Sequence, residues 1–391
     1  MGAICFISNC QFNKHTGGID RVCFYLIEEL YRRGYEIVCC YSKESIGDKI
    51  DYVKNYKLPN IEVYSEENIS FMEKLIKVEG IDVILDNSHS MQYFNLLEHV
   101  KKSVRFKLMK VQHTDPFAAI KSLRDNYDYI DYSIKGLFGR IVKKLFFYLK
   151  FFLSYYLRLQ SLTGQTKRYS VGCDKYIVLS QGFVVKLRRY FKFWQGSDKL
   201  DFVYNPISIN NDNKEIRDKK NQVIFVGRLD YQKRVDRLLR IWRKVSEKHN
   251  DWNLVIVGDG EERGRLENYA KDLNLKNYTF VGSVESKEYM LDSKICCVTS
   301  SHEGFSMVVL EAQLYGCVPL AFDSYETLSE IIQDDRLKVQ PFSEKQFVSQ
   351  LDKLMLDDVL LSDMKKKGWQ NVKRFEVSEI VDKWEKMILE K

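Results

Sequence analysis

Two glutamates eight residues apart, Glu303 and Glu311, carry the strongest chemical signal in this sequence. A helix that opens after Glu303 places Glu311 on the same side as Met307, Leu310 and Leu314, at about 100° per residue. A carboxylate on an apolar helix face is costly unless something hydrogen-bonds it. Glu311 therefore either caps a neighbouring backbone amide or accepts hydrogen bonds from a polar ligand.

Two cations, Arg228 and Lys233, precede these glutamates at a place suited to bind an anion. They lie between a strand expected at 222–226 and a helix expected to run to about His249. The start of a helix presents free N–H groups and the positive end of its dipole to anions. The spacing alone leaves two alternatives, a solvated surface pair and a diphosphate site.

The elements that position these residues read as alternating strands and helices. Around the glutamates, a strand at 295–298 leads through a polar loop into a short helix, Gly316 ends that helix, and 318–322 is the next strand. Two further strands, 254–257 and 278–281, end in glycine turns. Alternation of this kind predicts an α/β fold with a parallel sheet.

The first half of the chain repeats the pattern. A strand at 3–7, a helix that Gly17 and Gly18 open and that runs to about Arg33, and a strand at 36–41 form a βαβ unit. Strands are also expected at 81–86, 107–111 and 175–180, with a helix at 181–190. His89 and His113 follow two of these strands, at the sheet edge where open α/β sheets bind ligands. For each histidine the alternative is a solvated loop residue.

The stretch 299–319 resembles the Glu-x7-Glu motif of retaining glycosyltransferases built from two Rossmann-like domains, the GT-B fold, and in particular those of family 4. The resemblance rests on Glu303-Gly304-Phe305-Ser306, on Glu311-Ala312 after an apolar helix, and on Gly227-Arg228-Leu229 with Lys233 and the helix that follows. It covers nearly the whole chain, densely over 222–322 and thinly before 210.

The resemblance implies a role for each matched residue. Glu303 and the amides after it would hold the sugar hydroxyls of a nucleotide-diphosphate-sugar donor, Glu311 the ribose hydroxyls, and Arg228 with Lys233 the diphosphate. The implied catalytic residues are His113, Glu303, Arg228 and Lys233. The implied donor-binding residues are Gly17, Gly18, Gly227, Arg228, Lys233, Gly282, Val284, Glu303, Gly304, Phe305, Ser306, Met307 and Glu311.

The expected domain organisation follows from the same resemblance. Residues 1–209 would form an N-terminal Rossmann-like acceptor domain, with a basic amphipathic insertion at about 132–173. Residues 210–376, opening with a polar linker at 210–221, would form the nucleotide-sugar domain. Residues 377–391 would form a helix that crosses back to the first domain. In one place the sequence departs from the family, because the loop 323–327 carries side chains where Gly-Gly is common.

Composition limits the other classes of protein. With 391 residues, 45% hydrophobic and 29% charged, the chain is long enough for two ordinary globular domains. The nine cysteines include no Cys-x-x-Cys spacing, so we interpret them as small buried hydrophobes rather than metal ligands. No basic segment precedes the short apolar run at 4–7. A cytoplasmic protein is therefore expected.

The insertion at 132–173 predicts a membrane-facing helix. It contains no acidic residue between Asp131 and Asp174. Its basic residues fall within a helical sector of about 120°, opposite an apolar face: Arg140, Lys143, Lys144, Lys150 and Arg158. Lysines interrupt the apolar run too often for a transmembrane span. The alternatives are an interfacial helix against an anionic inner leaflet and a helix packed on the first domain with a solvated basic edge.

The sequence thus predicts a retaining hexosyltransferase, peripheral at the inner face of the cell membrane. It would move a sugar to a hydroxyl acceptor, such as a lipid-linked glycan of capsule, O-antigen or exopolysaccharide synthesis. A UDP-sugar is the favoured donor and GDP-mannose the second. No cofactor and no metal are expected, and no nucleic acid partner. The alternative on the same fold is a non-catalytic sugar-nucleotide-binding protein. A Rossmann dehydrogenase is disfavoured because Gly-x-Gly-x-x-Gly is missing, and a phosphorylase would need lysine-bound pyridoxal phosphate.

Overall fold

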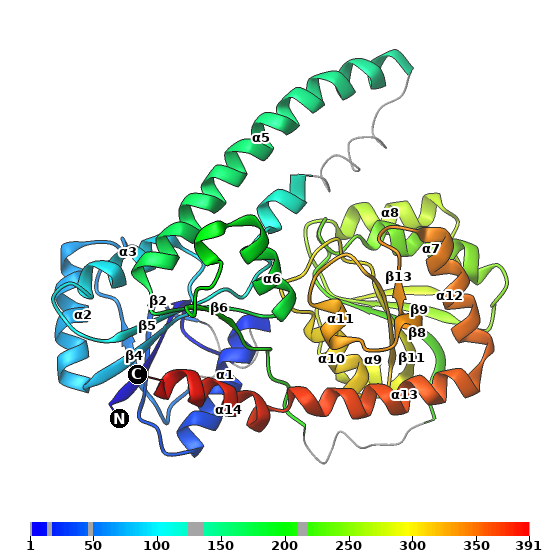
Figure 1. The fold of residues 1–391 in the computed structure, drawn as a ribbon. Coiled ribbons are helices and arrows are strands. Elements are labelled where there is room, and N and C mark those ends of the chain that lie inside the picture. The colour runs from blue at the N-terminus through cyan, green and yellow to red at the C-terminus, as the bar shows by residue number, and fades with distance from the viewer. Residues whose placement is uncertain (1, 14–17, 46–49, 124–136, 210–217, 391) are drawn as a thin grey trace. The chain divides into compact units, whose positions relative to one another are not determined.

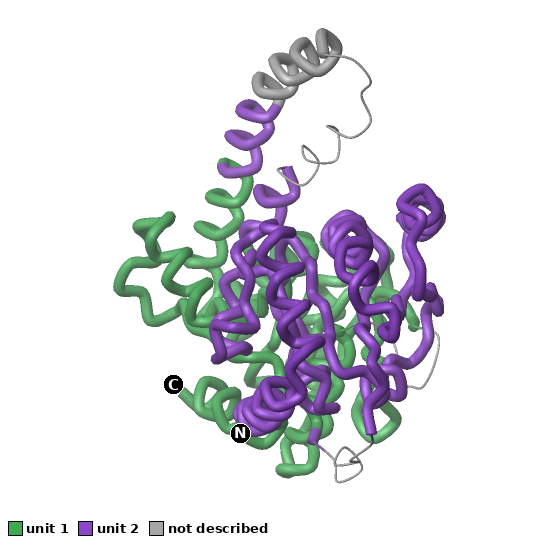
Figure 2. Tube along the Cα trace, turned by 90° about the vertical axis from the view of Figure 1, so that its right-hand side faces the viewer, with its two compact units in different colours: residues 1–116, 160–208, 375–391 green, residues 117–159, 209–374 purple. Residues whose placement is uncertain are grey.

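The computed structural model describes residues 2–13, 18–45, 50–123, 137–209 and 218–390, the side chains of 137–150 excepted. The chain divides into two compact units (Figure 2). Unit 1 comprises residues 1–116, 160–208 and 375–391, and unit 2 comprises residues 117–159 and 209–374. Each unit is built around its own parallel sheet.

The sheet of unit 1 has the strand order β3-β2-β1-β4-β5-β6-β7. Its strands are β1 (Ala3–Cys10), β2 (Ile37–Lys43), β3 (Lys54–Lys57), β4 (Ile81–Asp86), β5 (Lys107–Val111), β6 (Lys175–Val178) and β7 (Leu200–Phe202). Phe6 of β1 lies between Cys39 of β2 and Leu85 of β4, and all three are buried. The order of the strands reverses between β1 and β4, which is the point where open α/β sheets bind ligands.

The helices that accompany this sheet begin and end at residues suited to those positions. They are α1 (Gly18–Arg32), α2 (Glu66–Glu79), α3 (Met91–Val100), α5 (Leu137–Gly172), α6 (Gln181–Tyr190) and α14 (Val377–Leu389). The Ser65 hydroxyl caps α2 by accepting from the Asn68 amide, and Gly80 ends the helix with φ 59°. The Ser180 hydroxyl caps α6 in the same way.

Helix α14 belongs to unit 1 although unit 2 precedes it in the chain. It packs against α1, where Arg33 donates to Asp382 at 2.6 Å and to the Ser378 carbonyl at 3.0 Å. Arg33 also pairs with Glu385 and, at 2.8 Å, with Glu29. The apolar face of α14, which includes Ile380 and Trp384, is buried.

Helix α5 is one continuous element that both units share (Figure 1). Its final turns, within unit 1, bury Tyr169, whose ring packs edge-on against Phe94 with centroids 4.7 Å apart. Earlier in the helix, Arg158 donates to the Ser122 hydroxyl at 3.0 Å and to the Ala119 carbonyl. Among the helices of the described residues, none is both long and apolar enough to cross a membrane.

The sheet of unit 2 has the order β10-β9-β8-β11-β12-β13. Its strands are β8 (Lys220–Val226), β9 (Asn253–Val257), β10 (Tyr278–Gly282), β11 (Ser293–Val298), β12 (Val318–Phe322) and β13 (Lys338–Val339). β11 pairs in parallel with β8 on one side and β12 on the other. The order reverses between β8 and β11, so the loops after these two strands meet at the preferred ligand position.

The helices of unit 2 are α7 (Val235–Ser246), α8 (Arg263–Asp272), α9 (Lys287–Asp292), α10 (Met307–Leu314), α11 (Leu328–Ile331), α12 (Glu344–Leu356) and α13 (Asp358–Val372). Helix α10 contacts β11, β12 and α13 (Figure 1). It is therefore buried almost all round rather than on one side only. Gly316 follows it with φ 64°, a left-handed conformation that favours glycine.

Several predicted elements coincide with the structure, including β4, β5, β12 and α6. The linker predicted at 210–221 is too long by at least two residues, because Lys220 and Asn221 already belong to β8; residues 210–217 lie outside the described part. The first domain was predicted to run without interruption from 1 to 209, with 377–391 returning to it, whereas the structure groups 117–159 with unit 2. β3 (Lys54–Lys57) and β7 (Leu200–Phe202) were not anticipated, because both are short and β3 is polar.

Candidate active site

The two predicted key residues of unit 2 are in direct contact. Lys233, in the loop after β8, places Nζ 2.6 Å from Oε1 of Glu303, in the loop after β11. The Lys233 side chain is 16% exposed and that of Glu303 is 10% exposed. An ammonium has three donors, and this ion pair uses one of them. The pair therefore lies at the reversal point of the sheet with donor and acceptor capacity left for a ligand.

Backbone contacts hold these two loops together and so fix the ion pair. The Ser301 amide donates to the Gln232 carbonyl at 2.8 Å, and the Thr299 hydroxyl donates to the Lys233 carbonyl at 2.9 Å. The Gln232 side chain donates to the His302 carbonyl at 2.8 Å and reaches Oε2 of Glu303 at 3.4 Å. The position of Glu303 is thus set from the β8 loop.

Three glycines end the adjacent strands β8, β9 and β10, and they pack without side chains. Gly227 donates to Val257, and Gly258 donates to Gly282. A Cβ on Gly258 would stand 1.9 Å from the Gly227 carbonyl oxygen, which excludes any other residue there. Gly258 and Gly227 also have φ of 139° and 153°. The glycines bring the backbones close together, while the exposed Val284 follows the β10 turn.

Arg228 differs from Lys233 in its surroundings. Its side chain is 76% exposed, and its guanidinium pairs with Asp230 at 3.2 Å. Asp230 in turn accepts from the Lys233 amide at 3.1 Å, which shapes the same loop. Arg228 therefore presents a largely solvated cation beside the loop that carries Lys233.

The segment after Glu303 leads into α10 and is buried. Phe305, Ser306 and Met307 are 7%, 4% and 8% exposed. Ser306 occupies the position before the helix, but its hydroxyl makes no capping hydrogen bond. Glu311, within α10, is 8% exposed, so its carboxylate is held in the interior of unit 2 as the sequence indicated.

His113 lies in unit 1, just beyond the end of β5. Its Nε2 is 2.8 Å from Oδ1 of Asn87, and the Asn87 amide nitrogen donates to the Leu85 carbonyl at 3.1 Å. This pattern assigns the proton to Nε2 and leaves Nδ1 as an acceptor. Burial, aided by the nearby His89 and Lys110, lowers the pKa of His113 to about 3. His113 is therefore neutral, and its Nδ1 is buried without a partner among the described residues.

A buried ion pair holds the turn that contacts His113. Lys110 and Asp86, 2% and 0% exposed, lie 3.0 Å apart. Lys110 also donates to the Ser88 carbonyl at 2.5 Å, and the Ser88 amide and hydroxyl donate to Asp86. These bonds fix the turn after β4, in which Asn87 lies.

The other predicted site residues differ in how far they can be described. Gly17 lies outside the described residues, and Gly18 is the exposed first residue of α1. Four predicted membrane-binding residues lie on α5 within the stretch whose side chains are not described, Arg140, Lys143, Lys144 and Lys150. Arg158, the fifth, is bonded to the 119–122 turn of the protein itself.

Part of the chain is similar to a known protein family. The profile of the family described as "Glycosyl transferases group 1" matches residues 207–371. The match covers less than half of the chain. The matched segment contains the whole β8 loop, the β11 loop and α10, so it carries Arg228, Lys233, Glu303 and Glu311.

The chain is similar to three known proteins over segments of different length. It is 36% identical over 179 residues to the amylovoran biosynthesis glycosyltransferase AmsD of Erwinia amylovora, covering 45% of the chain and 50% of that protein. It is 24% identical over 387 residues to an uncharacterized glycosyltransferase of Haemophilus influenzae, covering 94% and 95%. A Campylobacter jejuni alpha-1,4-N-acetyl-D-galactosaminyltransferase, whose name includes a PP-undecaprenol-linked saccharide, is 27% identical over 224 residues, covering 56% and 60%.

Solved structures confirm the predicted GT-B fold. The lipopolysaccharide outer core galactosyltransferase WaaB superposes with a TM-score of 0.68 at 16% identity, covering 99% of both chains. HepE of Anabaena, solved with UDP, gives 0.70 at 14% identity, again covering 99% of both. The assignments to family 4 and to a retaining mechanism stay predictions.

Sequence reasoning missed the residues that act through others. Gln232 contacts Glu303, and Asn87 contacts His113, yet neither residue type is distinctive in a loop.

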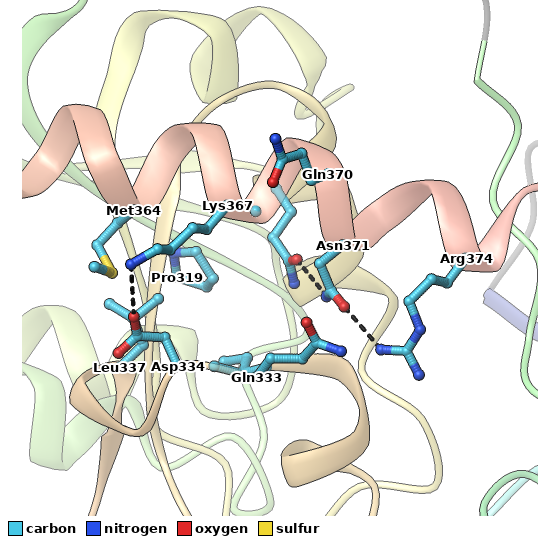
Figure 3. Close-up of a pocket in the computed structure, with 12 residues that line it drawn as sticks. Pro319, Gln333, Asp334, Leu337, Met364, Lys367, Gln370, Asn371 and Arg374 are labelled. Atoms are coloured by element: carbon cyan, nitrogen blue, oxygen red, sulfur yellow. Dashed lines mark hydrogen bonds and ion pairs between the residues drawn. The ribbon is translucent and has the colours of Figure 1, made fainter.

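Unit 2 also contains a cavity of about 410 Å³ beneath α13 (Figure 3). Pro319 and Leu337 place this cavity near the starts of β12 and β13, at the edge of the sheet opposite Lys233 and Glu303.

Proposed function

We propose that the protein is a retaining glycosyltransferase that moves a hexose-type sugar from a nucleotide-diphosphate donor to a hydroxyl acceptor. The observation that carries this proposal is the 2.6 Å contact between Lys233 and Glu303 at the reversal point of the unit 2 sheet. A cation for a diphosphate and a carboxylate for sugar hydroxyls then stand side by side, as a sugar diphosphate requires.

The proposed chemistry centres on charge that builds on the departing diphosphate while the anomeric carbon becomes oxocarbenium-like. Lys233, Arg228 and the amino end of α10 would stabilise that charge. Glu303 would hold the sugar through its hydroxyls, and Glu311 the ribose. No carboxylate is assigned as a nucleophile; the acceptor would attack on the face that the diphosphate leaves, and a phosphate oxygen would take its proton. His113, neutral and with Nδ1 as an acceptor, can receive a hydrogen bond from a hydroxyl.

A UDP-sugar is the proposed donor, and GDP-mannose is the second choice. Two solved structures of the same fold, HepE of Anabaena and TarM of S. aureus, contain UDP. The proposed clamp uses side-chain cations in place of a metal, so no metal and no other cofactor are proposed.

A lipid-linked glycan is the proposed acceptor, in the synthesis of a capsule, O-antigen or exopolysaccharide at the inner face of the cell membrane. Relatives are named for amylovoran biosynthesis and for a PP-undecaprenol-linked saccharide. Helix α5 supports this proposal, because four large apolar side chains of its described part are more than half exposed: Phe152, Leu153, Tyr156 and Leu157. These side chains would enter the lipid, and the basic residues of the same helix would stay in the layer of anionic headgroups.

Turnover with a panel of nucleotide sugars and a polyprenyl-diphosphate-linked acceptor tests the transferase proposal. The product should retain the anomeric configuration of the donor, and an inverted product would reject the retaining mechanism. Donor binding without transfer or hydrolysis would favour a non-catalytic sugar-nucleotide-binding protein instead.

Flotation with liposomes tests the membrane proposal separately. Binding should require anionic lipid and weaken with salt. The variant Lys143→Glu, Lys144→Glu, Lys150→Glu should float less than the wild type. Equal flotation of the two proteins would reject the basic helix as the membrane contact.

A further inference from the structure

Tyr325 is a buried polar residue that the proposed mechanism does not use. It lies in the loop after β12 and is 4% exposed. Its hydroxyl group is buried and makes no hydrogen bond within the described residues. A buried phenol O–H normally has a partner, since leaving it without one costs free energy. The hydroxyl is therefore a donor that the described residues leave unused.

The loop that carries Tyr325 is fixed on both sides. The Ser324 hydroxyl donates to the Ser300 carbonyl at 2.6 Å, which ties the loop to the β11 loop. The Asp323 amide donates to the Val339 carbonyl at 2.8 Å, and the Leu328 amide donates to the Tyr325 carbonyl at 3.2 Å. The phenol is thus held in one place relative to the loop that contains Glu303.

Two groups of the candidate site, Ser306 and Glu303, influence the pKa of this phenol. Ser306 is close enough to oppose the shift in the Tyr325 pKa, although the pair lacks the geometry of a hydrogen bond. The Ser306 hydroxyl makes no bond to the start of α10 either. Burial raises the pKa of Tyr325 well above its ordinary value, and the charge of Glu303 raises it further. Tyr325 therefore stays protonated and remains a hydrogen-bond donor at neutral pH.

We propose that Tyr325 and Ser306, together with Glu303, form a subsite that recognises one polar substituent of the donor sugar. Glu303 can only accept hydrogen bonds, whereas the Tyr325 O–H can donate. A sugar hydroxyl satisfies both, because it donates to the carboxylate and accepts from the phenol. An acetamido group does so with its N–H and its carbonyl oxygen. A hydrogen in that position satisfies neither.

This subsite rests on the proposed function, and it concerns the part of the loop where the sequence departs from its family. Residues 323–327 carry side chains where the family commonly has Gly-Gly, which can offer only backbone groups. Tyr325 supplies a side-chain O–H donor, which a Gly-Gly pair lacks. Recognition of the sugar in this chain should therefore depend on a side chain that can be changed without altering the main chain.

Calorimetric binding of UDP and of the preferred nucleotide sugar to wild type, Tyr325→Phe and Ser306→Ala tests the inference. The preferred nucleotide sugar is first chosen from UDP-glucose, UDP-galactose, UDP-N-acetylglucosamine, UDP-N-acetylgalactosamine and GDP-mannose. If GDP-mannose binds best, GDP replaces UDP as the nucleotide without a sugar. Tyr325→Phe should weaken sugar-nucleotide binding about 3- to 10-fold, as the loss of one neutral hydrogen bond predicts. The Kd of the diphosphate alone should change less than about 2-fold. Tyr269→Phe is the matched control: among the described residues its hydroxyl accepts from Arg240 at 3.5 Å, and its loss should change neither Kd.

A set of deoxy analogues of the preferred sugar completes the test. One analogue should bind wild type and Tyr325→Phe equally, because the group that Tyr325 contacts is already gone. Equal weakening of the diphosphate and the sugar nucleotide would show that Tyr325 only maintains the loop, and it would overturn the inference. So would unchanged binding of both. Failure of wild type to bind any nucleotide or nucleotide sugar would instead reject the proposed function, and with it this subsite.

Discussion

Replacing Lys233 by methionine separates two roles of the Lys233–Glu303 pair. The change removes the ammonium and keeps a stem of similar length, so the carboxylate of Glu303 loses its cation. Glu303 is only 10% exposed, and its other oxygen has the long 3.4 Å contact with Gln232. Leaving such a group poorly satisfied costs about 1–3 kcal/mol of unfolding free energy. Urea unfolding of the purified protein measures this cost.

The catalytic role predicts a different magnitude. Removing one group that stabilises developing charge lowers the rate roughly 10²–10³-fold, equivalent to about 2.7–4 kcal/mol. Initial rates with the preferred nucleotide sugar measure it. The double variant Lys233→Met, Glu303→Gln should regain most of the stability, because no charge is left without a partner, but it should stay inactive.

A surface ion pair of the same unit provides the control. Lys220 pairs with Asp292 at 2.7 Å and is 67% exposed. Lys220→Met should therefore change stability by less than about 0.5 kcal/mol and leave the rate unchanged. Near wild-type kcat/KM in Lys233→Met, or recovery of activity in the double variant, would show that the pair is structural and refute the diphosphate assignment.

Four further outcomes are expected. Arg228→Ala should lower kcat/KM with little loss of stability, because Arg228 is 76% exposed; parallel unfolding and rate measurements check this. Glu311→Gln should weaken nucleotide binding less than Glu311→Ala, since an amide keeps one acceptor; equal Kd values would count against the ribose contact. The pKa of a histidine is about 6.5 in the unfolded chain, and that of His113 is about 3 in the folded protein. Protonation of the unfolded chain should therefore lower the free energy of unfolding as pH falls below 6.5, by about 2 kcal/mol at pH 5. Urea unfolding at pH 7 and pH 5 should show this loss in the wild type and not in His113→Gln. Activity should survive EDTA, and loss of activity that Mn²⁺ restores would contradict the proposed metal-free clamp.

The parts of the fold that the sequence predicted are those that local signals determine. β4, β5 and β12 are buried apolar runs between turn residues, and α6 begins at a serine that caps it. β3 has the sequence Lys-Asn-Tyr-Lys, and only pairing with β2 makes it a strand. The grouping of residues 117–159 with unit 2 also depends on contacts between distant segments, which no local pattern reports.

The candidate site divides in the same way. Lys233 and Glu303 were predicted because they stand in motifs at strand ends, and the structure shows them in contact. Their supports were not predicted, because Gln232 and Asn87 are ordinary loop residues whose role depends on what lies opposite them. Lys110 in a buried strand conflicts with the expected apolar pattern, and such a conflict is itself a signal that a partner such as Asp86 must exist.

The return of α14 to unit 1 has a consequence for biosynthesis. During translation, residues 209–374 of unit 2 emerge before residues 375–391, which complete unit 1. Until then α1 lacks the surface that α14 covers, and Arg33 lacks Asp382 and Glu385. Unit 2 can therefore fold on the ribosome while unit 1 is still incomplete, although unit 1 begins first. A circular permutant that places residues 375–391 before residue 1 should let unit 1 become complete earlier in translation. Nascent unit 1 should then resist protease at a shorter chain length than in the wild type.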